Sequence, residues 1–577
     1  MKKMKNLFKI IYFLIVVMTM GGCDDFLTVV PQDSLVAENY YTSEANVRAN
    51  TASLYGSVWW DFHSQFMWLA GDELAGDLYY TYDAEGQFYY NKVGAGNKFN
   101  NTGWEGLYRV VSFSNSIIND MPSSARENGV SEDVIQKALG EARYMRAVAY
   151  YFIAENWGEA PIIENATELI TSGNVADIYV NKHTQSSLYR FMCEDLEFAA
   201  GILPKTDEEG RVTKWSALGM LAKVYVTRGA YEGNSEYFSL AKEYARQVIE
   251  DSNLALYDNF STMFDVEANN SSESLFSIQC MVGNYGDGNS RNVNWSRGSR
   301  IADQTWGAGK GPTISLQELF AEHPNDARRK WTYMTHGDYY ENLDKANGGY
   351  TYQFSYRDPE DLDTQVESTN GMLAHIKKYV IGKSADTGGQ VGTNQDAGNN
   401  IYVQRLSDVY FLYAEASMGL SETTSDAEAI GYINKVLDTH GAGYNVSAPL
   451  TYIDLIKERR KEFAFEANSW YDIKRYYYRN NTAAIEYLNS MKRDQLYVFD
   501  YNSIDQEGLS TADKYVLEND RNSYIIGWET TDNGEWDGER VNNIVFNSSS
   551  MYISLPAEVT TKAPILLEGA VDYYYSE

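Results

Sequence analysis

Apolar side chains recur at helical spacing in several parts of the chain. In residues 140–157, Ala142, Met145, Ala149 and Phe152 fall on one face of a helix, and a glycine and a proline follow closely. Such a face packs against a neighbouring element, and glycine and proline are common where helices end. The same spacing predicts further helices at residues 214–229, 236–251, 403–420, 426–441 and 453–467.

Two pairs of these segments are separated by short breaks, which predicts helical hairpins. In the pair that starts at Trp215, Leu218 and Gly219 stand at the spacing of a tetratricopeptide repeat, whereas Ala222 occupies the place of the expected tyrosine. The helices also recur at irregular intervals, which excludes a regular solenoid. We therefore expect a mainly α fold, in which divergent tetratricopeptide-like helix pairs form a scaffold.

The character of the chain changes between about residues 255 and 400. Residues 283–311 contain seven glycines, and residues 347–356 and 382–400 are rich in glycine, asparagine and other polar residues. Such composition is typical of loops and short strands, and long irregular segments are usually functional or mobile. We expect this loop-rich region to carry the binding surface.

The amino terminus has the pattern of a secretory signal peptide. Lysines at positions 2, 3, 5 and 9 precede an apolar stretch from Ile10 to Met20, which is 11 residues long and too short to span a bilayer. Two glycines then precede Cys23, as in the lipobox of bacterial lipoproteins, although Met20 stands where leucine is usual. We predict lipidation at Cys23 and a soluble body tethered to a membrane; an ordinary cleaved signal is the alternative.

These patterns together predict a signal peptide that is followed by a single folded body. The expected organisation is a signal peptide at 1–22 and a single body at 23–577, with a helical framework at about 35–255 and 400–495, an inserted loop-rich region at about 255–400 and an irregular C-terminal segment at about 496–577.

Charge and aromatic content narrow the classes of partner. The formal net charge is −32, with 80 acidic and 48 basic residues, and a field of that sign repels the phosphates of nucleic acids. Aromatic residues make up 14 % of the chain, and 47 of them are tyrosines. Because buried hydroxyl groups need hydrogen-bond partners, some of this aromatic surface should face water or a ligand. Beyond Cys23 only Cys193 and Cys280 remain, so no disulfide framework is expected.

Catalytic and metal-binding motifs are absent from the sequence. No two of the six histidines lie three or four residues apart, and no phosphate-binding loop or nucleophile elbow is present. No cofactor is predicted, although a looser oxygen-lined Ca²⁺ site stays open. A carboxylate pair for glycoside hydrolysis would not be visible in sequence. In the charged segment at 457–475, Glu458 with Lys461 and Arg459 with Glu462 are spaced i,i+3, which favours a solvated, ion-paired helix face over an active site.

Aromatic residues concentrate in two segments, among short polar side chains. An aromatic ring covers the apolar face of a sugar, while carboxylate and amide groups bind its hydroxyls, so these segments predict carbohydrate binding. For each tryptophan, the alternative interpretation is that it packs in the core. We assign four of them to the framework: Trp104, Trp157, Trp215 and Trp470. The candidate binding residues are Asp72, Tyr79, Tyr82, Tyr89 and Asn97 in the first segment, and Trp295, Trp306 and Trp331 in the second.

Several of these segments, taken together and in order, resemble the SusD/RagB family of outer-membrane lipoproteins. The similar segments are CDDFLTVVPQ at 23–32, residues 140–163, 403–416, 429–437 and 456–476, and MYISLPAEV at 551–559. They span nearly the whole chain. Two departures are the Ser-Leu-Pro of the last segment, where Pro-Ile-Pro is common, and VLDTHGAG at 436–443, which lacks the usual arginines after the asparagine-containing helix.

The resemblance implies a function. It implies a SusD-like fold, in which helix pairs support a loop-rich face near residues 70–100 and 290–335, and a lipid anchor on the surface of the outer membrane. Members capture oligosaccharides as lids of TonB-dependent, SusC-like transporters and are not usually enzymes. The alternatives that remain are a peptide-binding lid of such a transporter, a glycoside hydrolase and a protein-interaction scaffold.

Overall fold

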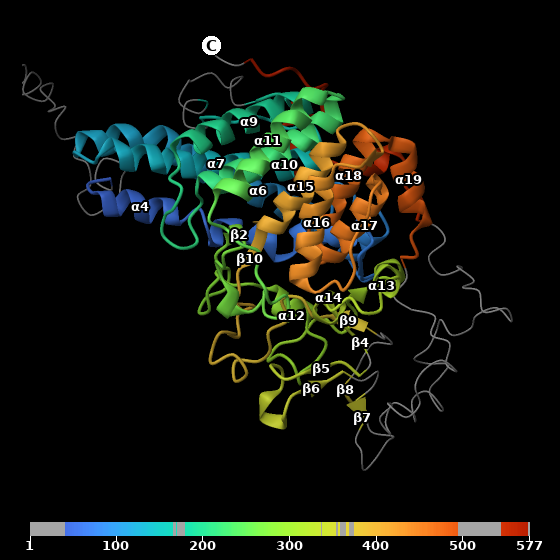
Figure 1. Ribbon diagram of the computed structural model, residues 1–577. Coiled ribbons are helices and arrows are strands. Elements are labelled where there is room, and N and C mark those ends of the chain that lie inside the picture. The colour runs from blue at the N-terminus through green and yellow to red at the C-terminus, as the bar shows by residue number, and fades with distance from the viewer. Residues whose placement is uncertain are drawn as a thin grey trace, which may run out of the picture.

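A computed structural model shows a mainly helical protein with an irregular region at one end (Figure 1). It describes residues 41–165, 169, 179–335, 337–352, 356–357, 365–367, 374–493 and 544–574. The predicted signal peptide, Cys23 and residues 494–543 of the predicted C-terminal segment lie outside the described residues. Cys193 and Cys280 are both free thiols, as expected.

The first half of the framework is a series of helices that pack on their neighbours in sequence. The series comprises α4 (Glu44–Ala52), α6 (Lys98–Glu127), α7 (Glu132–Trp157), α9 (Gln185–Ile202), α10 (Lys214–Glu232) and α11 (Ser235–Asp251). α7 ends at Gly158, as predicted. α10 continues past Gly229, where the sequence predicted its end. Gly229 packs against Phe238 of the next helix, and Gly233, in a left-handed conformation, caps the end of α10 instead.

The second half continues the array after the irregular region. It comprises α15 (Leu406–Met418), α16 (Ala427–His440), α17 (Tyr452–Phe463), α18 (Ser469–Arg479) and α19 (Asn481–Ser490). α11 packs against α15, so the two halves form one continuous helical body (Figure 1). The predicted hairpins of α10 with α11 and of α15 with α16 are present. The predicted helix at 403–420 starts later, because residues up to Arg405 belong to a strand.

The charged residues at 458–462 of α17 are buried, so the predicted solvated face is wrong. The side chains of Arg459, Arg460, Lys461 and Glu462 are almost entirely buried. Lys461 keeps the predicted i,i+3 pair with Glu458, at 2.6 Å, whereas Arg459 pairs with Asp408 and Asp472 on other helices. Buried charges are tolerated only when they are paired, and here the partners come from elements far apart in sequence.

A network around Arg405 joins the irregular region to this helix. The guanidinium of Arg405 lies 2.8 Å from Glu273, 2.7 Å from Glu462 and 2.8 Å from Glu466. His440 lies between Glu462 and Glu273, at 2.7 Å and 3.2 Å. Burial alone would lower the pKa of His440, but the two carboxylates outweigh it and raise the pKa to about 9.

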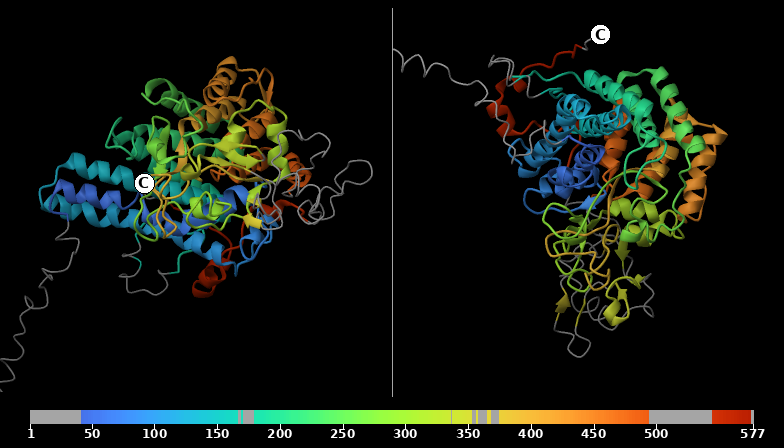
Figure 2. Two further views of the ribbon diagram at one scale, coloured as in Figure 1. Left: turned by 90° about the horizontal axis from the view of Figure 1, so that it is seen from below. Right: turned by 90° about the vertical axis from the view of Figure 1, so that its left-hand side faces the viewer.

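Short strands and loops form the irregular region below the helices (Figure 2, right). All strand pairs that the structure describes are antiparallel and two-stranded. They are β1 (Leu78–Tyr79) with β3 (Gly311–Pro312), β2 (Ser274–Ile278) with β10 (Ile401–Arg405), β4 (Tyr333–Thr335) with β9 (Ala374–Ile376), β5 (Tyr339–Tyr340) with β6 (Tyr350–Thr351), β7 (Tyr356–Arg357) with β8 (Gln365–Glu367), and β11 (Thr423–Thr424) with β12 (Leu450–Thr451).

Short helical turns complete the fold. Those near the aromatic segments are the 3₁₀ turn η1 (Ser57–Trp59), the π-helical turns η2 (Phe62–Phe66) and η3 (Leu69–Glu73), α5 (Gly86–Tyr89), α12 (Arg291–Trp295), α13 (Ile314–Ala321) and α14 (Arg328–Thr332). The others are η5 (Val266–Ala268), η6 (Lys345–Asn347), η8 (Ser548–Met551), α22 (Ala557–Lys562) and η9 (Pro564–Leu567).

Candidate binding site

Two polar residues of the predicted site, Asp72 and Asn97, are buried and hold the backbone together. The carboxylate of Asp72 accepts hydrogen bonds from the N–H groups of Phe465 and Ala467, each at 3.0 Å. Burial raises the pKa of this carboxyl well above its usual range. Asn97 caps α6 by accepting from the N–H groups of Phe99 and Asn100. Ligand contact was therefore wrongly predicted for both, since their polar atoms serve the fold.

Two of the predicted aromatic residues, Tyr89 and Trp295, are buried as well. The hydroxyl of Tyr89 donates to the carbonyl of Arg493 at 2.8 Å. The indole of Trp295 is surrounded by other rings, including that of Trp68 at a centroid distance of 6.1 Å. A sugar cannot stack on a ring that has no exposed face, so the prediction of ligand contact is wrong for these two residues.

Tyr79 and Trp331 are half-buried. The ring of Tyr79 packs edge-on against Tyr89, with centroids 5.1 Å apart. Trp331 lies on α14, where its indole packs edge-on against Tyr340 and the amine of Lys377 lies 5.6 Å from the indole. Each keeps some accessible surface, and a role in binding stays a prediction for both.

Three rings on the loops near these residues are at least half exposed. Tyr82 is 73 % exposed and Trp306 is 50 % exposed, and both were predicted. Tyr285 is 65 % exposed and was missed. It is the one aromatic residue among glycine, asparagine and aspartate at 283–288; an aromatic side chain with no apolar neighbours in sequence was the signal that pointed to an exposed loop tip.

Pairing of β1 with β3 brings the Tyr82 loop to the loop that follows Trp306. Lys310, just before β3, reaches back to Glu85 at 2.9 Å, and its amine lies 4.5 Å from the ring of Tyr80. Tyr80 in turn lies against Tyr82, with ring centroids 6.5 Å apart. Residues 80–85 and 306–310 therefore form one surface.

The loop of Trp306 is seated on the buried Trp295. The N–H of Gly307 donates to the carbonyl of Ser296 at 3.0 Å. A Cβ on Gly307 would lie 2.3 Å from the carbonyl carbon of Trp295, so only glycine permits this approach. The backbone at Trp295 and Ser296 thus holds the loop that carries Trp306.

The third ring, Tyr285, is held by the segment that contains η1 and η2. Its ring packs against Trp60 with centroids 4.9 Å apart, and Ser290, shortly after it, donates to the carbonyl of Ser64 at 2.7 Å. Gln65 next to Ser64 donates to Glu85 at 3.2 Å. The loops of all three rings therefore converge on residues 60–85, and we name Tyr82, Tyr285 and Trp306 the aromatic strip.

The polar groups around the strip suit hydroxyl ligands. Gln65 supplies an amide, Glu85 a carboxylate and Tyr80 a phenol. Burial, followed by the charge of Glu85, raises the pKa of Tyr80 to about 12, so its hydroxyl remains a donor at neutral pH. Within the described part of the chain, no cluster of three or more His, Cys, Asp and Glu could hold a metal ion. An oxygen-lined Ca²⁺ site built from other groups, which the sequence left open, is not tested by this.

Among the helices that the structure describes, no helix has both the length and the apolar character that a membrane crossing requires.

The chain matches family models over most of its length. The model of the SusD family matches residues 239–552. A second model, described as starch-binding associating with outer membrane, matches residues 36–226.

Relatives and solved structures agree with these matches. A SusD-like protein of Bacteroides ovatus is 29 % identical over 564 residues, which cover 96 % of each chain. SusD-like protein P2 of Formosa agariphila is 26 % identical and covers 82 % of this chain and 91 % of its own. A crystal structure solved with a xylogluco-oligosaccharide superimposes with a TM-score of 0.76 at 27 % identity, over 92 % of this chain and all (100 %) of the other. Since the first model spans more than half of the sequence, the chain belongs to the SusD family.

Proposed function

We propose that this protein captures a neutral oligosaccharide on the aromatic strip and delivers it to a TonB-dependent, SusC-like transporter of the outer membrane. A lipid on Cys23 anchors it there, facing the outside of the cell. The protein binds the glycan without cleaving it.

The exposure of Tyr82, Tyr285 and Trp306 is the observation that carries the proposal. Most aromatic residues that the structure describes are buried, whereas these three lie on loops that meet around one segment. A group of exposed apolar side chains that lie together on a soluble protein commonly marks a binding site. The apolar faces of sugar rings cover them, and sugar hydroxyls can bind Gln65 and Glu85 nearby.

Similarity to known proteins supports the class of ligand. The structure with a xylogluco-oligosaccharide covers nearly this whole chain. Xyloglucan fragments are neutral, which agrees with the net charge of −32 and with the carboxylates of Asp83 and Glu85 beside the strip. The description of the second family model, which names starch and the outer membrane, supports the location.

Calorimetry with residues 24–577 tests the proposal. The chain is titrated with xylogluco-oligosaccharides, laminarin, starch and an acidic glycan, and the variants Tyr82→Ala, Tyr285→Ala and Trp306→Ala are compared with the wild type. Loss of one well-placed aromatic contact should weaken binding about tenfold. Tyr574→Ala is the matched control, because Tyr574 is 90 % exposed and follows residues that pair with the start of α9 rather than with the loops of the strip.

Two outcomes would contradict the proposal. The first is that no neutral glycan binds, or that a peptide copurifies with the chain instead. The second is that all three variants bind like the control. Delivery is tested separately by copurification with a SusC-like transporter, and release of sugars from the bound glycan would show an enzyme.

A further inference from the structure

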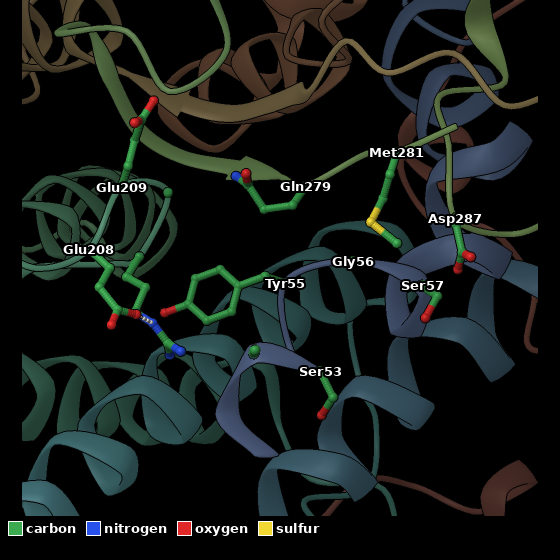
Figure 3. Close-up of a pocket in the computed structure, with 12 residues that line it drawn as sticks. Ser53, Tyr55, Gly56, Ser57, Glu208, Glu209, Gln279, Met281 and Asp287 are labelled. Carbon is green, nitrogen blue, oxygen red and sulfur yellow. Dashed lines mark hydrogen bonds and ion pairs between the residues drawn. The ribbon is translucent and has the colours of Figure 1, made fainter. Parts of the chain in front are cut away.

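A pocket of about 420 Å³ lies beside the loop that carries Tyr285 (Figure 3). This volume falls within the range of roughly 300–1,000 Å³ that is typical of small-molecule sites. It is formed where the end of α4 and η1 meet the end of β2 and the turn before α10. Its lining includes Ala52, Tyr55, Ser57, Arg211, Met281 and Asp287.

The wall of the pocket is rigid and apolar on one side. The ring of Tyr55 is fixed, because its hydroxyl donates to Glu141 at 2.7 Å and its edge packs on Phe276. Met281 is 61 % exposed, and Figure 3 shows its thioether reaching into the pocket toward Gly56. A methionine that reaches into a pocket from an exposed position offers polarisable surface to an apolar ligand face.

The polar groups of the pocket favour a neutral ligand with hydroxyls. Arg211, the cation among the described lining residues, is engaged by Glu208 and Glu141, both at 2.8 Å. The carboxylate of Asp287 accepts a hydrogen bond from the amide of Asn284 at 3.1 Å. Its carboxylate lies on the same side of the pocket as the hydroxyl of Ser57 (Figure 3). An anion would meet carboxylates without an uncommitted cation, whereas sugar hydroxyls can donate to Asp287.

The pocket is joined to the aromatic strip by a single loop. The N–H of Met281 donates to the carbonyl of Asp287 at 2.9 Å, which closes the loop at its base. At the tip, Tyr285 packs on Trp60, and a Cβ on Gly286 would lie 3.8 Å from the same indole. The tip therefore belongs to the strip, and the base lines the pocket.

We propose that this pocket is a second subsite, which takes a sugar residue of the same neutral glycan beyond Tyr285. The proposal rests on the function proposed above. A short oligosaccharide occupies the strip alone, and a longer or branched one also fills the pocket between Tyr55 and Met281.

The test fills the pocket without touching the strip. Ala52→Trp places an indole in it, and Ala49→Trp adds the same side chain to an exposed position of the same helix, outside the pocket. Met281→Ala removes the apolar contact instead and adds no bulk. Each variant is titrated by calorimetry with the shortest xylogluco-oligosaccharide that binds and with one at least twice as long. If another glycan of the panel binds instead, its fragments are used.

The proposal expects a dependence on ligand length. Ala52→Trp and Met281→Ala should weaken binding of the long oligosaccharide at least about fivefold, as expected for a loss of contacts in a second subsite. They should leave the short one within about twofold of the wild type. Ala49→Trp should bind both ligands normally.

The outcomes separate the two proposals. Equal binding of the long oligosaccharide by Ala52→Trp, Met281→Ala and Ala49→Trp overturns the subsite alone, provided that Tyr285→Ala still weakens it. Equal weakening of both ligand lengths also overturns it. No binding of any glycan by the wild type overturns the proposed function, and the subsite with it.

Discussion

The indole of Trp60 packs against the phenol of Tyr285, with ring centroids 4.9 Å apart and ring planes inclined by 66°. Trp60 is only 8 % exposed, whereas Tyr285 is 65 % exposed. On its other side Trp60 meets His63 edge-on at 5.4 Å. A buried ring thus fixes an exposed one, and a ring that is held in place before binding loses less freedom when a ligand arrives.

Trp60→Ala should therefore weaken glycan binding, although Trp60 itself is buried. Aromatic pairs contribute about 0.5–1.5 kcal/mol beyond the area that they bury, so we expect a loss of affinity of up to about tenfold by calorimetry. Trp60→Phe retains a ring under Tyr285 and should recover most of the affinity. Wild-type affinity in a folded Trp60→Ala variant would show that Tyr285 needs no support, or does not bind.

Asp72→Ala should reduce stability and leave the affinity for glycan unchanged. The substitution removes the acceptor for the N–H groups of Phe465 and Ala467, which both have positive φ, at 65° and 62°. Two orphaned buried donors should cost about 2–6 kcal/mol, at about 1–3 each. Urea denaturation measures the change in the free energy of unfolding. Lost affinity in the folded variant would return Asp72 to the binding site.

Arg405→Met should destabilise the protein strongly. It leaves three buried carboxylates, those of Glu273, Glu462 and Glu466, without their shared cation. Breaking a buried ion pair typically costs about 3–5 kcal/mol. The matched control is Arg190→Ala, which breaks the exposed pair with Glu194 and should cost less than about 1 kcal/mol. Similar melting temperatures for the two variants would contradict the structural role of the network.

Stability should fall on the alkaline side because of His440. Its pKa is raised from 6.5 to about 9 in the folded chain, so its protonation contributes stability that is complete below pH 6.5 and is lost as the pH rises through 9. At about 1.4 kcal/mol per pH unit, the full effect is roughly 3 kcal/mol. The carboxylate of Glu273 titrates outside this window, because its pKa is lowered to about 2. Burial alone would raise it, but His440, Arg405 and the backbone N–H of Tyr257 together outweigh burial.

Melting temperatures measured between pH 6 and 10 test this dependence. The wild type should lose stability across the window, and His440→Gln should start lower and show a flatter profile. Parallel profiles for the two proteins would mean that His440 is neutral in the folded chain.

The helices could be predicted because their signal is local. The apolar face of α7 and its end at Gly158 lie within one stretch of sequence. The burial of α17 could not be predicted in this way, because i,i+3 charge pairs look the same on a solvated helix. What buries Arg459 is the pair of partners on α15 and α18, Asp408 and Asp472, and only the fold brings them together.

The sequence predicted the loops that carry the exposed rings, but not which rings on those loops are exposed, and their role in binding stays a prediction. Trp295 and Trp306 both follow glycine-rich sequence, yet one is buried and the other exposed. The difference arises because the indole of Trp295 packs among the rings of Trp68, Tyr379 and Phe465, which lie far from it in sequence and leave no local pattern. Tyr285 was overlooked because it stands alone, although isolation among polar residues is what marks an exposed ring.

A crystal structure of residues 24–577 with the oligosaccharide that binds most tightly tests the central claim most directly. We predict sugar rings stacked on Tyr82, Tyr285 and Trp306, with hydroxyls hydrogen-bonded near Gln65 and Glu85. A glycan bound elsewhere, with all three rings left uncovered, would contradict it.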